Sequence, residues 1–245
     1  MQKKAQLTIF IIAAIFLVGI VFLFFAFQQG LLSQQSLSPD AEKIYSFVQN
    51  CIEHEGAETI YQIGQNGGYF FPPNLSTNSG VAIYSKDGKN YMPSKEQVEN
   101  EISFFMNQKL FFCTKNFVDF PDLDISQQEI STKTTIQDES ILFNVDYPIT
   151  VIKGTDKTLI KNFKYEVPVR MGIVYNSIYE FSRNQTSDGI CLSCMLEISE
   201  RNDLHVEMMD YDEKTTLFLF RDKNSKINDE DFVWIFANEY GVESI

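Results

Sequence analysis

Four cysteines are the residues of this chain best suited to chemistry: Cys51, Cys113, Cys191 and Cys194. An even number of cysteines in a chain outside the cytosol favours disulfide bonds. Cys191-Leu-Ser-Cys194 also has the spacing of a redox motif, which in thioredoxin-like sites lies at a strand-to-helix junction inside a βαβ unit. The surrounding sequence predicts no such unit, so we expect a local structural disulfide or two thiols there.

A zinc site is an alternative use of the same residues. Cys51 and His54 lie three positions apart on one face of a predicted helix, and with Cys191 and Cys194 they would form a Cys₃His ligand set. That set leaves Cys113 without a partner. We therefore predict no metal site and no cofactor.

The sequence contains none of the common catalytic motifs. His54 and His205 are its only histidines, and G-x-S-x-G, H-E-x-x-H and P-loop patterns are missing. Neighbouring carboxylates such as Asp210 and Asp212, or residues 229–231, fall in predicted turns, where acidic side chains are usually solvated. We expect no catalytic residue and a protein that is not an enzyme. An exported thiol-redox or other enzyme is the alternative.

Two helices are expected to position Cys51 and Cys113. The first, over 38–63, opens with Ser-Pro-Asp, which is typical of a helix N-terminus. The second, over 94–117, opens with the capping box Ser94-Lys-Glu-Gln97. Each cysteine lies on or beside the apolar stripe of its helix, so packing of the two helices would bring the sulfurs within bonding range. Two unrelated buried cysteines are the alternative.

The rest of the chain is expected to form strands and one further helix. Period-two alternation begins after Asp124. The pattern predicts a hairpin over 81–92, strands over 141–149 and 159–167 around a turn at 153–156, a helix over 169–183, strands over 204–208 and 217–219, and a buried strand over 232–236. Helices followed by antiparallel strands with packed helices indicate an α+β domain.

An uncharged apolar run occupies residues 7–27. As a helix it would be about 30 Å long, which is the thickness of a bilayer core. Ala26 lies between two phenylalanines, so a signal-peptidase site is lacking and we expect a retained anchor. Lys3 and Lys4 precede the run, whereas the next basic residue is Lys43. The positive-inside rule therefore places the N-terminus in the cytoplasm and the remainder outside.

Four segments follow from this topology: a cytoplasmic N-terminus (1–6), a transmembrane helix (7–27), a juxtamembrane linker (28–38) and an extracytoplasmic α+β domain (39–245). All 33 acidic residues, but only 18 of the 20 Lys and Arg residues, lie after residue 27. Such an acidic domain is a poor match for nucleic acid or anionic lipid headgroups. Apart from the membrane itself, we expect a protein partner at the cell surface.

Two sequons lie in predicted loops on the exported side. They are Asn74-Leu-Ser and Asn184-Gln-Thr, which makes Asn74 and Asn184 candidates for glycosylation. The motif is short and occurs often by chance.

The segment Lys-Lys-Ala-Gln-Leu-Thr-Ile-Phe at residues 3–10 is similar to the class III leaders of archaeal type IV pilin-like proteins. This resemblance implies cleavage between Ala5 and Gln6, and a pilin-like filament subunit as an alternative function. Pilin-type subunits usually carry a glutamate a few residues after the cut. Here the first acidic residue is Asp40, which departs from that pattern.

More broadly, the order of features resembles a family of uncharacterised archaeal single-pass membrane proteins. The segments that carry the resemblance are the leader, VQNCIEHEGAETIYQIGQNGGYFFPP, PSKEQVENEI and FNVDYPITV. It covers most of the chain and implies a surface location and a Cys51–Cys113 pairing, without a catalytic role. The function expected from the sequence is that of a membrane-anchored surface protein acting by protein interaction.

Overall fold

The computed structural model describes residues 17–18, 37–185 and 189–240. The chain divides into two units, residues 1–38 and 39–245. The fold described below is that of the second unit.

The predicted transmembrane helix, 7–27, lies outside the described residues except for Leu17 and Val18, and the predicted segment 1–6 lies outside them completely. Within the described part of the chain, no helix combines the length and the apolar character needed to cross a bilayer. The anchor therefore stays a prediction from the sequence.

The described residues form four α-helices: α2 (Pro39–Gln65), α3 (Lys95–Thr114), α4 (Met171–Arg183) and α5 (Leu192–Asn202). The predicted capping box at the start of α3 is confirmed. Ser94 Oγ accepts the Gln97 N–H, and Gln97 Oε1 accepts the Ser94 N–H. The predicted first helix is also confirmed, and it buries Ile44, Val48, Cys51, Ile52, Ile60 and Ile63.

Helix α3 ends at Thr114, three residues before the predicted end, and a short 3₁₀ turn η1 (Lys115–Phe117) follows. Lys115, Asn116 and Phe117 all have φ between 45° and 58°. Left-handed backbone costs about 1–2 kcal/mol for each such residue. The turn buries the Phe117 ring, which packs against Phe47, and this burial offsets part of the strain.

A five-stranded sheet in the order β2-β1-β11-β10-β9 covers one end of α2. Its strands are β1 (Ile83–Lys86), β2 (Lys89–Asn90), β9 (His205–Asp210), β10 (Thr215–Ile227) and β11 (Glu230–Glu239). The predicted hairpin, the strand pair around residues 210–214 and the last buried strand are therefore confirmed. β1 and β11 pair in parallel, whereas the other pairs are antiparallel, so the sheet is mixed rather than purely antiparallel as predicted.

Two three-stranded antiparallel sheets, β3-β6-β7 and β4-β5-β8, lie toward the other end of α2. Their strands are β3 (Asp124–Gln127), β4 (Ser131–Ile136), β5 (Ile141–Asp146), β6 (Ile149–Lys153), β7 (Asp156–Ile160) and β8 (Phe163–Val167). The prediction of one continuous strand over 141–149 is wrong. Pro148 separates β5 from β6, and because proline has no N–H, the strand leaves one sheet there and enters the other.

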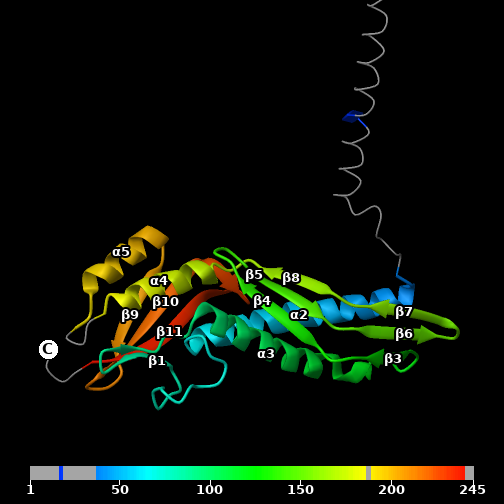
Figure 1. The fold of residues 1–245 in the computed structure, drawn as a ribbon, viewed down its shortest axis with the longest axis horizontal. Helices are drawn as coiled ribbons and strands as arrows, with labels where there is room; N and C mark the ends of the chain where they lie inside the picture. The colour runs from blue at the N-terminus through cyan, green and yellow to red at the C-terminus, as the bar shows by residue number, and fades with distance from the viewer. Residues whose placement is uncertain (1–16, 19–36, 186–188, 241–245) are drawn as a thin grey trace, which may run out of the picture. The chain divides into compact units, whose positions relative to one another are not determined.

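Helix α2 links the sheets, as Figure 1 shows: it runs from β7 and β8 at its start to β11 at its end. Gly64 makes the close approach to β11 possible. A Cβ at this position would lie 2.4 Å from the Val233 carbonyl oxygen. Because Gly64 has no side chain, α2 can pass close to Val233 of β11 and continue to its end at Gln65. The chain then reverses at Gly67 and Gly68, which have φ of 64° and 82°.

Aromatic side chains fill the space between α4 and the five-stranded sheet. The Phe181 ring of α4 packs on Phe218, Phe220 and Phe236. Trp234 is the only tryptophan of the chain and is fully buried. Its indole fluorescence is therefore a direct probe of whether this core is folded.

A buried ion pair joins α4 and α5 to β10. Asp222 is 0% exposed, and its carboxylate Oδ1 lies 3.1 Å from Arg170 Nη1. Ser225 Oγ donates to the second carboxylate oxygen, and Arg170 Nη2 donates to the Asn202 carbonyl at the end of α5. The pair lies where the register of β10 shifts against β11, so it stabilises an irregular point of the sheet.

Candidate functional site

The predicted pairing of Cys51 with Cys113 is present as a disulfide between α2 and α3. The two Cα atoms lie 5.9 Å apart. Lys109 of α3 also approaches Glu55 of α2, with 3.6 Å between Nζ and Oε2. These contacts fix the orientation of α3 on α2, and so determine which face of α3 meets the strands.

One face of α3 closes the outer edge of β4. Side-chain oxygens four positions apart on the helix accept alternate backbone N–H groups of the strand. The pairs are Glu99 with Ile136 at 2.8 Å, Ser103 with Thr134 at 3.0 Å, and Asn107 with Thr132 at 2.8 Å. An uncovered strand edge is a template for pairing with another chain, so this helix face blocks β4 from such pairing.

The series of acceptors stops at Phe111, the next position four residues along. Its side chain accepts no hydrogen bond, and here a groove of about 740 Å³ opens between α3 and the segment that joins β3 to β4. We call it the α3 groove. Its walls include Phe104, Phe111 and Phe112 on one side and Gln127, Glu129 and Ile130 on the other.

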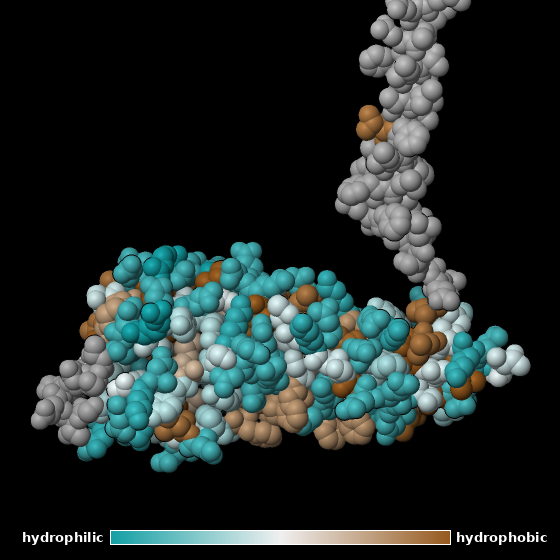
Figure 2. Space-filling view, in the orientation of Figure 1, coloured by the Kyte–Doolittle hydropathy of each residue, from teal (hydrophilic) through white to brown (hydrophobic). Residues whose placement is uncertain are grey.

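The phenylalanines of the α3 groove are unusually exposed for their size. Phe104, Phe111 and Phe112 are 56%, 50% and 68% exposed. Figure 2 shows apolar side chains along the lower border of the molecule, where Figure 1 places α3. A group of large apolar side chains surrounded by polar ones is typical of a binding surface.

Gln127 and Tyr147 hold the two walls of the α3 groove together. Tyr147 Oη donates to Gln127 Oε1, and Gln127 Nε2 donates to Asn116 Oδ1 just after α3. Thr114 Oγ1 lies 3.3 Å from Tyr147 Oη. Burial raises the pKa of Tyr147, and the hydrogen bond with Thr114 opposes the rise. The phenol is thus a neutral hydrogen-bond donor at neutral pH.

Strand β3 borders the groove with one edge unpaired. It is the outermost strand of β3-β6-β7, and no strand of the described residues pairs with its other edge. Gln128 N–H donates to the Pro148 carbonyl, toward β6. Because backbone groups of neighbouring residues point to opposite edges of a strand, the N–H groups of Ile125 and Gln127 point to the unpaired edge.

The strand side of the groove is acidic. Asp119, Asp122, Asp124 and Glu129 are the only charged residues between Lys115 and Lys133. All four of these carboxylate side chains are exposed. The site therefore combines an apolar wall, an unpaired strand edge and an acidic segment, of which Glu129 lines the groove.

The second cysteine pair, Cys191 and Cys194, also forms a disulfide, at the start of α5. The Cys₃His zinc alternative is wrong, because the Cys51 sulfur is bonded to Cys113. Among residues 17–18, 37–185 and 189–240, no three His, Cys, Asp or Glu side chains are grouped to hold a metal ion. His205 is exposed on β9.

The other predicted sites belong to the surface or lie outside the described chain. Asn74 and Asn184 are both exposed, so each is accessible to modification, and glycosylation stays a prediction. Ala5 and Gln6, the predicted leader cleavage positions, lie outside the described residues.

The α3 groove was not predicted from the sequence, although part of its signal is visible there. Phe104 and Phe111 are seven positions apart and lie on a different face of α3 from the apolar stripe through Val98, Ile102 and Phe105. Phe112 follows Phe105 by seven positions and so continues that stripe, yet it is 68% exposed. A second apolar face on an amphipathic helix indicates a second contact. Only the structure shows that the described chain leaves this face open.

The chemistry available in the α3 groove is binding rather than bond-making. Its polar side chains are amides, one phenol and one carboxylate, without a nucleophile–base pair. Comparison with known proteins adds no further assignment: no protein-family model, no curated protein and no solved structure matches this chain.

Proposed function

We propose that this chain is a membrane-anchored surface protein whose ectodomain binds an extended, basic segment of a partner protein in the α3 groove. The observation that carries the proposal is the exposure of Phe104, Phe111 and Phe112 beside the unpaired edge of β3. Those rings supply apolar contact area, and the strand supplies backbone hydrogen bonds.

The anchor rests on the sequence. The uncharged run over 7–27 and the flanking Lys3 and Lys4 support a retained helix with the N-terminus inside. The full-length chain should stay in the membrane fraction after carbonate washing, and protease added to intact cells should digest the region after Phe27. A soluble form that begins near Gln28 would contradict the anchor.

An extended segment suits the site because β3 offers unpaired backbone groups. A peptide that adds to a strand edge gains main-chain hydrogen bonds, and pockets for alternate side chains give selectivity. The N–H groups of Ile125 and Gln127 point to that edge, and Phe111 and Phe112 line the adjacent groove. Every second side chain of a bound strand would thus meet the apolar wall.

Charge favours a basic partner over a second copy of this chain. Glu129 lines the groove, and the segment that leads into β3 adds Asp119, Asp122 and Asp124, with no Lys or Arg in the sequence between Lys115 and Lys133. The whole chain has a formal net charge of −13, so a second copy would bring like charge to this acidic segment. Complementary charge raises the rate of association and selects among partners.

A labelled peptide tests the proposal on the full-length chain in nanodiscs. The probe is a ten-residue peptide of alternating lysine and valine, followed by fluorescence anisotropy. We expect saturable binding that weakens with added salt, and we expect Phe111→Ser with Phe112→Ser to weaken it at least about tenfold, because aromatic anchors dominate interface energies.

Matched control variants distinguish peptide binding in the α3 groove from non-specific binding. Tyr179→Ser removes a similarly exposed ring from α4 and should leave binding unchanged. Trp234 fluorescence reports that each variant is folded. Equal binding of an alternating glutamate–valine peptide, or undiminished binding by the Phe111/Phe112 variant, would refute the proposed site.

A further inference from the structure

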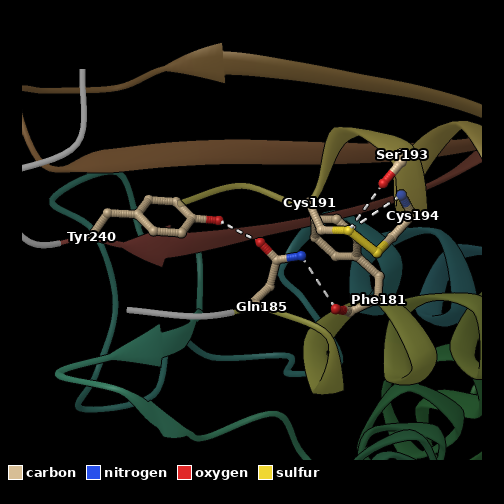
Figure 3. The surroundings of a disulfide bond; sticks show 6 residues. All are labelled: Phe181, Gln185, Cys191, Ser193, Cys194 and Tyr240. Carbon is tan, nitrogen blue, oxygen red and sulfur yellow. Dashed lines mark hydrogen bonds between the residues drawn. A yellow bond between two sulfur atoms is a disulfide. The ribbon is translucent and has the colours of Figure 1, made fainter. Parts of the chain in front are cut away.

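The Cys191–Cys194 disulfide lies at the N-terminus of an exposed helix. Cys191 is the N-cap of α5, and its Sγ accepts the Cys194 backbone N–H at 3.3 Å. Figure 3 shows this contact together with that to Ser193 Oγ, 3.6 Å from the same sulfur. A helix N-terminus carries partial positive charge, and together with a backbone N–H donor it stabilises a cysteine thiolate.

The surroundings of this disulfide leave it accessible. Cys191 and Cys194 are both partly exposed, and the first turn of α5 contains no acidic residue that would oppose a thiolate. Leu192 and Leu196 lie four positions apart on α5 and are 57% and 62% exposed. The disulfide therefore borders a small apolar surface suited to a polypeptide.

Two hydrogen bonds hold the Gln185 side chain just after α4. Gln185 Nε2 donates to the Phe181 carbonyl at the end of α4, and Tyr240 Oη donates to Gln185 Oε1 at 3.0 Å (Figure 3). Burial raises the pKa of Tyr240 to about 12, so this donor stays protonated at neutral pH. α5 itself buries only Ile198 in the described fold, so the fold depends little on its N-terminal turn.

The two disulfides of the chain differ in what they constrain. Cys51 and Cys113 are 62 positions apart and join two helices, whereas Cys191 and Cys194 are three positions apart within one turn. A bridge that closes so short a loop removes little freedom from the unfolded chain. Its reduction therefore leaves the rest of the fold in place.

From these observations we propose that Cys191 and Cys194 are a thiol–disulfide exchange site that acts on cysteine pairs of exported polypeptides. A thiolate of the reduced partner attacks Cys191 Sγ, which forms a mixed disulfide and releases Cys194 as a thiolate that takes up a proton. The partner's second thiolate then attacks the partner's first sulfur in the mixed disulfide, which breaks the bond to Cys191 and releases Cys191 as a thiolate that takes up a proton. The partner leaves oxidised, and Cys191 and Cys194 are left as thiols.

The experiment uses the full-length chain and a synthetic peptide with two cysteines. Incubation with the reduced peptide, followed by differential alkylation and peptide mapping, should show peptide oxidation matched by new thiols at Cys191 and Cys194. Cys51 and Cys113 should stay bonded, and Trp234 fluorescence should be unchanged. Reduction of both disulfides together, or of neither, would overturn the proposal.

Two single variants test which sulfur is attacked. With the disulfide form of the peptide, Cys194→Ser should trap a mixed disulfide at Cys191 about tenfold faster than Cys191→Ser traps one at Cys194, because the N-cap sulfur receives the helix N–H. Equal rates for the two variants would show that the pair is a structural disulfide between two ordinary cysteines, and would contradict the proposal. The exchange assay on the unmodified chain remains decisive if either variant fails to fold.

Discussion

Ser103 Oγ of α3 accepts the backbone N–H of Thr134 in β4 at 3.0 Å, which places a helix side chain where the carbonyl of a neighbouring strand would otherwise accept that N–H. The same relationship recurs one helical turn later, where Asn107 accepts the Thr132 N–H. A polar face of α3 thus substitutes for a fourth strand of the sheet β4-β5-β8, and the α3 groove begins where this face ends.

Removal of one such acceptor should destabilise the fold. Asn107→Leu leaves the Thr132 N–H without its partner, and an unsatisfied buried donor costs about 1–3 kcal/mol. Gln108→Leu, at the neighbouring exposed position, should cost much less. Urea unfolding followed by Trp234 fluorescence measures both. Equal stabilities for the two variants would show that water replaces the side chain at the edge.

The Arg170–Asp222 pair gives a second stability prediction. Arg170→Met leaves the fully buried Asp222 carboxylate without its cation, which should cost about 3–5 kcal/mol. Arg201→Met is the control, because Arg201 and its partner Glu180 are both 46% exposed and such an exposed pair contributes little to stability. A loss below 1 kcal/mol for Arg170→Met would mean that Ser225 alone satisfies the carboxylate.

The disulfide between α2 and α3 should stabilise the fold through the unfolded chain. In the chain-entropy model a bridge across 62 positions contributes about 4 kcal/mol. Cys51→Ala, Cys113→Ala and the double variant should therefore lose similar amounts, and Cys191→Ala should lose far less. Additive losses for the first two variants would instead indicate that the cysteines act only as separate core residues.

Tyr84 predicts how stability changes at alkaline pH. Its hydroxyl donates to the Gly67 carbonyl at 2.8 Å and accepts from Trp234 Nε1. Burial raises the pKa of Tyr84 well above its usual value near 10, and the Trp234 hydrogen bond opposes the rise. The folded state thus favours the protonated phenol. The contribution of Tyr84 to the free energy of unfolding is therefore complete below about pH 10 and is lost as the pH rises further.

Tyr84→Phe tests whether Tyr84 causes this loss of stability at alkaline pH. At neutral pH the variant should lose about 1–3 kcal/mol, because the Trp234 N–H and the Gly67 carbonyl lose their partner. Its stability should then fall less steeply than that of the unmodified chain above pH 10. Tyr91→Phe, at an exposed ring, should change neither quantity. A parallel decline in all three chains would assign the alkaline loss to other groups.

Local signals in the sequence were sufficient for the helices with clear caps and for the tight turns. The capping box at Ser94 and the turn at Lys153–Asp156 are encoded within a few residues, and both are present. The Cys51–Cys113 bridge followed from apolar stripes on two helices, because packing those stripes together leaves few arrangements.

Features that depend on distant contacts were not predictable in the same way. The parallel pairing of β1 with β11 joins residues that are about 150 positions apart, and nothing near Ile83 specifies it. Helix α5 was missed; it buries only Ile198, and its apolar residues Leu192 and Leu196 are exposed. The predicted strand over 141–149 is divided at Pro148. Proline lacks an N–H, so its effect on a strand depends on whether its nitrogen faces a neighbouring strand, which is a distant contact.

Hydrogen exchange along β3 tests the central claim, the binding of an extended basic segment in the α3 groove, most directly. The full-length chain in nanodiscs is saturated with the alternating lysine–valine peptide, and exchange is read for individual amides. We expect the Ile125 and Gln127 amides to exchange about tenfold more slowly, because a bound strand accepts their hydrogens, with no protection in the Phe111→Ser/Phe112→Ser variant. Unchanged exchange at both amides in the saturated complex would contradict the account.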